Sequence, residues 1–343
     1  MKRTLLVSTQ SSFTFPLAEA VRKQMFAEAL AISAAGGDAA ILIISSGHQP
    51  GLTEQGIPIS FVTKREALRL RRRLAGYDEV YYYGSIGLYA LLVGFASRKK
   101  VEAQLVITCG GLYSIGGRVW IRKLIGKFLH RYYNQVHLYT EHQKQTLLAA
   151  SFKYAPLIRP KRPLLEALPA RTGAGKSSIP TLLYMGHIST FKGIDIVLSV
   201  FEGLVQKIEN LQVIFAINGV MEDRAANSRL ERLEAAYPGK IIRKGVVDPY
   251  EELSRAHLYL YPIKQPAGTF AFPLSLYESL QCGTPFLSSD IDGVNEFFDS
   301  YFLLDPQEPR QFIDRAREIL SQPAVADSRV KKNLAAINDT IGQ

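Results

Sequence analysis

The sequence predicts an α/β protein of two domains, each built on a mostly parallel β-sheet. Three observations support this prediction. The chain has 343 residues, which exceeds the length that a single hydrophobic core usually supports. Short apolar runs alternate with segments of helical period along its length. Residues 155–180 contain five prolines and no helical pattern. We therefore expect one domain at residues 1–165, a linker at 166–180 and a second domain at 181–343, whose last helix packs back on the first domain.

The apolar and helical patterns place the elements of both domains. In the first half, strands are expected at residues 4–8, 40–44, 79–83, 104–108 and 135–139, with a helix at 18–33 that Gly36 and Gly37 can end. In the second half, strands are expected at 181–185, 212–217, 240–243, 258–261 and 285–288. Helices are expected at 194–209, 226–236, 250–255, 275–281 and 309–321. Open α/β sheets bind ligands outside the carboxyl ends of their strands, so we expect a binding cleft there.

The composition is that of an ordinary soluble globular protein, with 47% hydrophobic and 21% charged residues. The two cysteines, Cys109 and Cys282, cannot form a disulfide framework and match no metal-ligand spacing. The apolar run Leu5–Val7 is too short for a signal peptide, and no apolar stretch approaches the length that spans a bilayer. These features favour a cytoplasmic protein.

The net charge of +10 is concentrated in the first half of the chain. Residues 1–169 hold 23 Lys/Arg and 10 Asp/Glu, whereas residues 170–343 hold 18 and 21. Such asymmetry suggests a polyanionic partner: anionic lipid, a phosphorylated acceptor or nucleic acid. A basic surface that serves only solubility is the alternative. Nucleic-acid binding is not expected, because the recognised modules and their aromatic platforms are missing from the sequence.

Residues 117–134 form the clearest amphipathic pattern of the first half. One arc of this predicted helix carries Ile121, Leu124, Ile125, Phe128, Leu129 and Tyr132, and the other carries Arg118, Arg122, Lys123, Lys127 and Arg131. A second basic run, residues 64–73, adds five arginines and one lysine. Basic amphipathic helices bind anionic membrane interfaces, so we predict peripheral membrane association. A helix packed on the core, with a solvated basic face, is the alternative.

Residues 170–177 (ARTGAGKS) satisfy a relaxed P-loop pattern. A working P-loop needs a buried strand before it and a helix after it, so that backbone amides can surround the phosphates. Pro169 precedes this segment and Pro180 follows it closely, which disfavours both elements. We therefore interpret the segment as part of the linker.

Four segments of the second half occur in a recognisable order. They are a strand, glycine turn and helix at residues 182–204, a strand with a glycine at 213–220, a strand and helix at 244–263, and a loop and helix at 268–296. This series, about 115 residues long, resembles the C-terminal domain of glycosyltransferase family 4. These are retaining glycosyltransferases with the GT-B fold, in which two Rossmann-like domains face each other across a deep cleft. The first half is similar to the family only in its alternation of strands and helices.

The resemblance implies a metal-independent enzyme without a cofactor. Family members move a sugar from a nucleotide-sugar donor, here UDP- or GDP-linked, to a glycan or lipid-linked acceptor, as in polysaccharide, lipopolysaccharide or glycolipid synthesis. Without a metal, fixed cations must offset the charge of the leaving diphosphate. The family's glycine, arginine and lysine fall on Gly186, His187 and Lys192. An ordinary imidazole is mostly neutral at pH 7, although an adjacent phosphate favours its protonated form.

The resemblance also assigns the donor loop and the nucleoside contacts. The family's second loop glutamate, which accepts hydrogen bonds from the ribose, matches Glu278. The first, which binds sugar hydroxyls, falls on Phe270, which can only stack on a sugar face. The donor loop comprises Gly268, Thr269, Phe270, Ala271 and Phe272, and the backbone of Val246 and Val247 is expected at the base, with uracil and guanine not distinguished. Cys282 is expected to be a packed residue and not a nucleophile.

On the acceptor side, small residues stand where the family carries its own motifs. Ser11 and Ser12 replace a glycine-rich turn, and Cys109 and Gly110 lie where many members carry a histidine. Small residues there leave room for a sugar, although turn formation alone explains them equally well. The replacements at Phe270 and His187 leave a second hypothesis open. In it, the chain is a non-catalytic GT-B scaffold or a regulatory subunit of a glycosylation complex.

Overall fold

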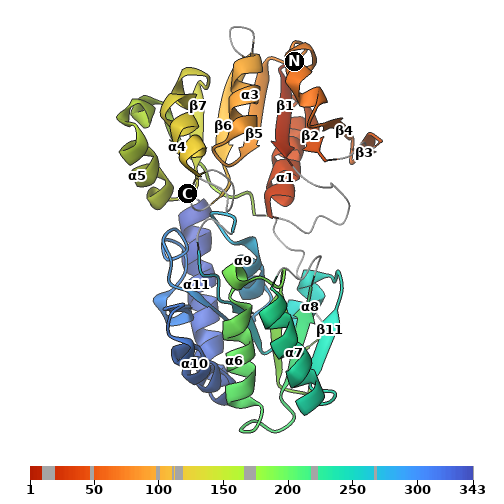
Figure 1. Ribbon diagram of the computed structural model, residues 1–343, viewed down its shortest axis with the longest axis vertical. Helices are drawn as coiled ribbons and strands as arrows, with labels where there is room; N and C mark the ends of the chain where they lie inside the picture. Colours follow the sequence, from red (N-terminus) through yellow and green to blue (C-terminus); the bar gives the residue numbers. More distant parts are fainter. Residues whose placement is uncertain are drawn as a thin grey trace. The chain divides into compact units, whose positions relative to one another are not determined.

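The computed structural model describes residues 1–9, 20–46, 50–97, 101–109, 112, 119–165, 175–217, 223–265 and 269–342 (Figure 1). The chain forms two compact units. Unit 1 comprises Met1–Glu166 together with Phe270–Phe272, and unit 2 comprises Ala167–Thr269 and Pro273–Gln343. The predicted second domain includes Phe270–Phe272, whereas these three residues cluster with unit 1.

Unit 1 is an α/β layer structure on an eight-stranded sheet of order β3-β4-β2-β1-β5-β6-β7-β8. All its strand pairs are parallel except β3 with β4. The strands are β1 (Arg3–Thr9), β2 (Asp38–Ser45), β3 (Leu52–Glu54), β4 (Ile57–Thr63), β5 (Glu79–Gly84), β6 (Glu102–Ile107), β7 (Gln135–Leu138) and β8 (Ile158–Pro160). The helices are α1 (Ala20–Ala34), α2 (Leu70–Leu74), α3 (Leu88–Ser97), α4 (Val119–Phe128) and α5 (Glu141–Ala150).

One apolar cluster of unit 1 lies on the sheet face that α2, α3 and α5 cover. Leu70 and Leu74 of α2, Val93 of α3 and Leu147 of α5 are buried there against the sheet. Helix α1 also lies along the sheet, and it ends where predicted. Gly36 has φ +82°, and the Gly37 N–H donates to the Ile32 carbonyl oxygen at 2.9 Å.

The five predicted strands of the first half are confirmed, each end within two residues. The proline-rich stretch that starts at residue 155 contains the end of a 3-10 helix (Phe152–Leu157) and strand β8, neither of which was predicted. Prolines are tolerated in β8 because it is the edge strand of the sheet. The helix predicted over residues 117–134 is shorter. It ends at Phe128 and continues as a 3-10 turn over Leu129–Arg131.

Unit 2 has a six-stranded parallel sheet of order β11-β10-β9-β12-β13-β14. Its strands are β9 (Thr181–Met185), β10 (Gln212–Ala216), β11 (Ile241–Lys244), β12 (Leu258–Tyr261), β13 (Phe286–Ser289) and β14 (Leu303–Leu304). Its helices are α6 (Ile194–Leu204), α7 (Arg224–Ala236), α8 (Pro249–Arg255), α9 (Leu274–Gln281), α10 (Pro309–Ser321) and α11 (Pro323–Gly342). All ten predicted elements of this half are present, although α6 ends five residues early.

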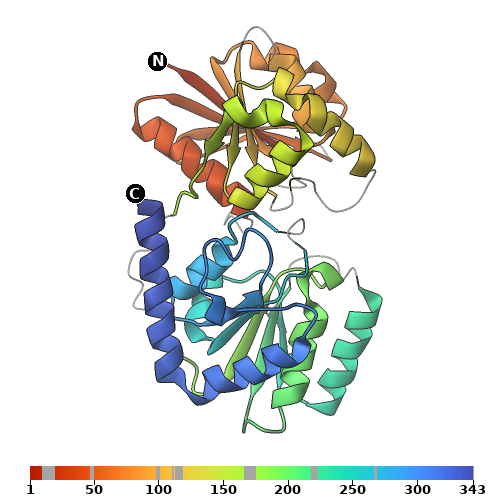
Figure 2. The same cartoon turned by 90° about the vertical axis from the view of Figure 1, so that its left-hand side faces the viewer.

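Helices cover both faces of this second sheet (Figure 2). Helices α6, α7 and α10 share one apolar cluster with the strands. Helix α9 packs against α8 and against the C-terminal helix α11, where the Tyr277 hydroxyl donates to Asn338 Oδ1 at 3.0 Å. Within the described part of the chain, no helix combines the length and the apolar character needed to cross a membrane.

Candidate functional site

The strand order of unit 2 indicates where a ligand of this unit would bind. The chain adds strands to one side of β9 as far as β11 and then crosses to the other side with β12. Ligands of open α/β sheets bind at such a switch point, outside the carboxyl ends of the two strands. In unit 2 this point lies where β9 runs into Gly186 and β12 runs into Pro262.

The turn after β9 is held by its neighbours. Gly186 has φ +142°, a conformation open to glycine and strained for other residues. Its N–H donates to the Ala216 carbonyl oxygen at 3.0 Å, and the Tyr184 hydroxyl donates to the His187 carbonyl oxygen at 2.5 Å. The backbone of His187 is therefore fixed, while its side chain lies in an exposed position. The structure thus brings Gly186 and His187 to the switch point.

Lys192 lies in a short 3-10 turn that packs directly on the loop after β12. Its N–H donates to the Ser189 carbonyl oxygen at 3.0 Å. The next residue, Gly193, has φ +68°, and a Cβ placed on it would lie 1.8 Å from the Pro262 carbonyl oxygen. The N–H of Lys264 donates to the Phe191 carbonyl oxygen at 2.9 Å. Only glycine permits this close approach, which positions Lys192 relative to β12.

Positive charge and hydroxyl groups meet at this edge of the sheet. The ammonium group of Lys192 is 5.6 Å from the ring centroid of Tyr261, whose hydroxyl shares a 2.7 Å hydrogen bond with Thr269 Oγ1. Lys264 Nζ donates to Asp195 Oδ2 at 2.6 Å. Fixed cations at the end of a parallel sheet can neutralise a phosphate group. Tyr261 and Lys264 were not among the predicted site residues, although their place at and just after the end of a predicted strand could have indicated them.

Glu278 lies on α9 and is 5% exposed. Its Oε1 accepts a 3.2 Å hydrogen bond from the hydroxyl of Tyr250, in the first turn of α8. Asp248 caps α8 by accepting from the Tyr250 N–H at 2.9 Å. The Glu278 carboxylate is therefore oriented by Tyr250, and Tyr250 is itself held in place by the Asp248 cap of α8. Tyr250 is a third site candidate that the sequence did not reveal, since the pairing joins positions 28 residues apart.

Cys282 follows Glu278 by about one helical turn, and its thiol is partly buried and bonded to the backbone. Its Sγ donates to the Tyr250 carbonyl oxygen at 3.8 Å, and burial raises the pKa of the thiol. A thiol kept neutral is a poor nucleophile. The arrangement agrees with the predicted packing role.

The segment after β11 carries the residues expected at the nucleotide base. Val246 is 67% exposed and Val247 is partly exposed. Strand β11 itself is tied to α8 by Lys244 Nζ, which is 2.5 Å from Glu252 Oε1. Gly268 lies outside the described residues.

Phe270 occupies a different environment from the one a sugar-stacking residue needs. It is 8% exposed, it forms an antiparallel bridge with Cys109, and its ring packs edge-on against Tyr139 with centroids 5.0 Å apart. The next N–H, that of Ala271, donates to the Thr108 carbonyl oxygen at 2.9 Å. Phe272 is fully buried. All these contacts lie within unit 1.

Of the four residues predicted on the acceptor side, the structure describes Cys109. Ser11, Ser12 and Gly110 lie outside the described residues. The Cys109 carbonyl oxygen accepts from Gln143 Nε2 at 2.9 Å. Gln143 also forms a capping box with Thr140 at the start of α5. The spacing Thr-x-x-Gln is therefore a sequence signal for the start of this helix.

The P-loop-like segment has no phosphate-binding geometry in its described part. Gly175–Pro180 contains no helix, and Lys176 Nζ donates to the Ala256 carbonyl oxygen at 2.7 Å and to Thr284 Oγ1. Burial lowers the pKa of Lys176 to about 8. Lys176 thus ties α8 to β13, as a linker residue would. Among the described residues, no three His, Cys, Asp or Glu side chains are grouped so that they could hold a metal ion.

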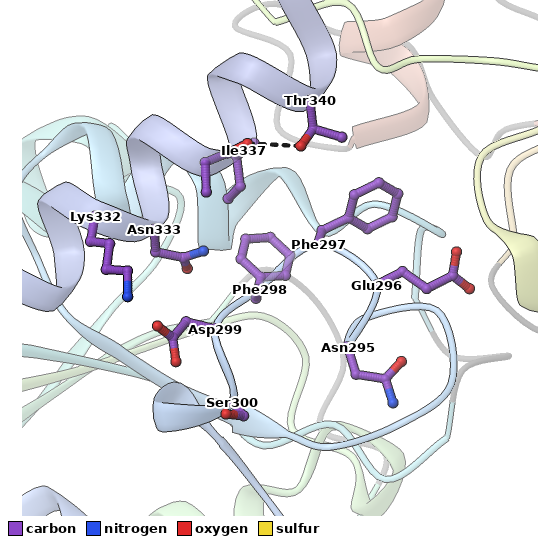
Figure 3. Close-up of a pocket in the computed structure, with 11 residues that line it drawn as sticks. Asn295, Glu296, Phe297, Phe298, Asp299, Ser300, Lys332, Asn333, Ile337 and Thr340 are labelled. Atoms are coloured by element: carbon purple, nitrogen blue, oxygen red, sulfur yellow. Dashed lines mark hydrogen bonds between the residues drawn. The ribbon is translucent and has the colours of Figure 1, made fainter.

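A cavity of about 390 Å³ lies between α11 and the loop after β13, and its lining includes none of the predicted site residues. Phe298 and, from α11, Asn333 and Ile337 line it (Figure 3). Asn333 Oδ1 is buried and has no hydrogen-bond partner among the described residues. The cavity is therefore distinct from the switch-point site described above.

Comparisons with known proteins agree with this geometry. Residues 179–322 match the family model described as glycosyl transferases group 1. HepE from Anabaena in complex with UDP-glucose is similar over 98% of this chain and 95% of its own, with a TM-score of 0.74 and 11% identity. The α,α-trehalose-phosphate synthase (UDP-forming) from Burkholderia vietnamiensis is similar over 99% and 94%, with a TM-score of 0.74 and 10% identity. Among curated proteins, none has a sequence that matches significantly. The chain thus has the GT-B glycosyltransferase fold, and its second unit carries the sequence pattern of glycosyl transferases group 1.

Proposed function

We propose that this chain is a retaining glycosyltransferase, of the family 4 type, that transfers a sugar from a UDP-sugar to a glycan or lipid-linked acceptor. The observation that carries the proposal is the position of Lys192 at the switch point of unit 2, fixed by the close approach of Gly193 to Pro262. We propose a UDP-sugar and not a GDP-sugar as the donor because HepE, which has the same fold, was solved with UDP and with UDP-glucose.

In the proposed reaction, the bond between the anomeric carbon and the β-phosphate oxygen breaks, and the bonding electrons remain on the diphosphate. The Lys192 ammonium, with His187 beside the same turn, offsets this charge. The acceptor hydroxyl oxygen bonds to the anomeric carbon from the face that the diphosphate leaves. Its proton passes to the departing phosphate. No metal ion is required by this scheme.

Glu278 is proposed to bind the ribose. A carboxylate accepts hydrogen bonds from two hydroxyl groups, and the Tyr250 hydroxyl already orients one of its oxygens. Tyr250 is therefore a positioning residue for the nucleoside. The backbone of Val246 and Val247 remains the proposed contact for the base.

One observation favours a second candidate function, that of a non-catalytic GT-B subunit. The family's sugar-binding glutamate is replaced by Phe270, and the ring of Phe270 packs against Tyr139. Such a protein would bind UDP and would transfer no sugar. Turnover measured alongside binding separates the two functions.

The proposed cellular setting is the cytoplasmic face of a membrane, with peripheral attachment. The basic character of the first half, 23 Lys/Arg against 10 Asp/Glu in residues 1–169, supports an anionic surface as a partner. A lipid-linked acceptor would be reached from such a position.

A thermal-shift panel of UDP, GDP, ADP and their sugar conjugates tests the donor site. A ligand at one hundred times its Kd stabilises the folded state by about 2.7 kcal/mol, so a genuine donor raises the Tm by several degrees. Lys192→Ala should abolish the UDP response, whereas Lys207→Ala, an exposed lysine after α6, should keep it. An unchanged response in Lys192→Ala would exclude its phosphate role, and a silent panel would refute the nucleotide-sugar site.

A further inference from the structure

Helix α3 of unit 1 presents two large apolar side chains, Leu88 and Phe95, outward. Its sequence, LYALLVGFAS, contains no charged residue. The buried positions are Ala90, Val93, Gly94 and Ser97, whereas Leu88 is 58% exposed and Phe95 is 61% exposed. A surface helix of a soluble protein normally has the opposite distribution. The outward stripe of α3 therefore needs an apolar partner.

Helix α4 continues this apolar surface. Trp120, Leu124 and Phe128 follow one another at intervals of four residues and are 65%, 49% and 44% exposed. They lie on one face because residues four apart are neighbours on a helix. The sequence predicts a single apolar arc here. The structure divides it, since Leu129 is fully buried while Leu124 and Phe128 are exposed.

The two helices are neighbours, so their exposed residues occupy adjoining parts of unit 1. Helix α3 contacts α4 and the 3-10 turn that follows α4 (Figure 1). A Cβ on Gly94 would lie 2.8 Å from Tyr132 Cβ, which shows how closely these elements approach. The Phe95 ring packs edge-on near the Tyr132 ring, with centroids 6.3 Å apart. We call the exposed side chains Leu88, Phe95, Trp120, Leu124 and Phe128 the α3–α4 face.

Basic side chains lie on both sides of the α3–α4 face. Helix α2 contacts α3 and carries Arg71, Arg72 and Arg73, all exposed. On α4, Lys123 and Lys127 are exposed beside the apolar stripe. The guanidinium of Arg131 lies 5.3 Å from the Phe128 ring centroid. Residues 103–140 contain five Lys/Arg and no Asp or Glu.

We propose that the α3–α4 face binds the surface of an anionic lipid bilayer. The apolar centre would enter the boundary between headgroups and acyl chains, and the arginines and lysines on its two sides would meet lipid phosphates. A tryptophan at the edge of such a face suits the membrane interface. A nucleic acid would match the charge and leave the apolar centre exposed to water. A second copy of this chain would place the basic rims against each other.

This inference deepens the acceptor side of the proposed function and rests on it only for the kind of acceptor that the bilayer would present. The binding itself involves unit 1 residues that take no part in the donor site. Binding to lipid and binding to UDP are therefore separable measurements.

Flotation with vesicles of phosphatidylcholine alone, and of phosphatidylcholine mixed with phosphatidylglycerol, tests the proposal on the full chain. The wild type should float with the mixed vesicles and remain behind with the neutral ones. Lys123→Glu combined with Lys127→Glu should weaken partitioning by about 30-fold or more, since each basic residue near an anionic surface contributes about fivefold. The matched control is Lys207→Glu combined with Lys331→Glu, two exposed lysines of unit 2, which should float as the wild type does.

The apolar contribution is tested in the same assay. Leu88→Ser combined with Phe95→Ser should reduce flotation by about tenfold or more, because it removes apolar area that would leave water. Val325→Ser, a 44% exposed valine of α11, serves as its control. All these side chains are exposed, so the variants should retain the wild-type Tm and the wild-type UDP response.

Several outcomes would overturn the proposal. These are equal flotation with neutral and mixed vesicles, loss of flotation in the unit 2 control pair, or a concentration-dependent dimer that the Leu88 and Phe95 changes dissociate. If the wild type binds UDP and does not float, the α3–α4 face is not a membrane surface while the donor site stands. If it floats and ignores every nucleotide, the proposed function fails and the surface assignment stands.

Discussion

Replacing Gly193 by alanine tests whether the loop that carries Lys192 is positioned by its contact with Pro262. The change introduces two costs. At φ +68°, an alanine is strained by roughly 1–2 kcal/mol. Its Cβ would also lie 1.8 Å from the Pro262 carbonyl oxygen, where distances under 3.0 Å are essentially never found. The two loops must therefore separate by more than about 1 Å.

The separation should affect both stability and function. We expect the free energy of unfolding, measured by urea titration, to fall by about 3 kcal/mol or more, combining strain with lost packing. A displacement of about 1 Å at a catalytic group can slow a reaction about 100-fold, so sugar transfer should fall by that order. UDP affinity should also fall, because Lys192 moves with its loop.

Gly239→Ala is the matched control. Gly239 has a similar φ of +75°, and a Cβ there meets nothing within 4 Å. In this variant the free energy of unfolding should fall only by the cost of the strain, about 1 kcal/mol. The variant should bind UDP as the wild type does. If Gly193→Ala behaves like Gly239→Ala in both assays, the contact with Pro262 does not position the site.

Two further predictions concern single hydrogen-bonding groups. Tyr250→Phe removes the hydroxyl that donates to Glu278, and calorimetry should show UDP binding weakened about fivefold. Tyr259→Phe, which removes a comparable bond to Ser275, should leave UDP affinity unchanged, and an equal loss in both would contradict the ribose role of Glu278. Burial, with Lys161 and Arg159 nearby, lowers the pKa of His137 from 6.5 to about 4. Between pH 6.5 and pH 4 the His137 imidazole is protonated in the unfolded chain and neutral in the folded one. The free energy of unfolding should therefore decrease by about 3 kcal/mol as the pH falls from 6.5 to 4. Urea titrations of His137→Asn should show a smaller decrease over that range, and an identical decrease would refute the assignment.

Local signals predicted the regular elements of unit 2 closely. Strands β9 and β12 have the predicted bounds because each is a buried apolar run with turn residues after it. Helix α10 begins at the predicted Pro309, since proline suits the first turn of a helix. The site roles of Gly186, Lys192 and Glu278 have another basis, the resemblance to glycosyltransferase family 4, and they stay predictions.

Features that depend on distant contacts could not be predicted in this way. Strand β8 has a proline-rich sequence and exists because an edge position beside β7 tolerates it. The bridge between Cys109 and Phe270 joins segments that no local pattern connects. The exposure of Leu124 beside the buried Leu129 depends on where α3 lies, so periodicity alone could not divide the arc.

The grouping of Phe270–Phe272 with unit 1 has a consequence for the order in which the protein can be completed during synthesis. Residues 1–165 leave the ribosome first. Phe270, whose ring packs on Tyr139, and Ala271, whose N–H donates to the Thr108 carbonyl oxygen, follow roughly 100 residues later. At about 5–20 residues per second, the delay is roughly 5–20 s. For that interval the carboxyl ends of β6 and β7 lack their native covering, so a nascent chain stalled before residue 270 should expose Tyr139 to chaperones and proteases.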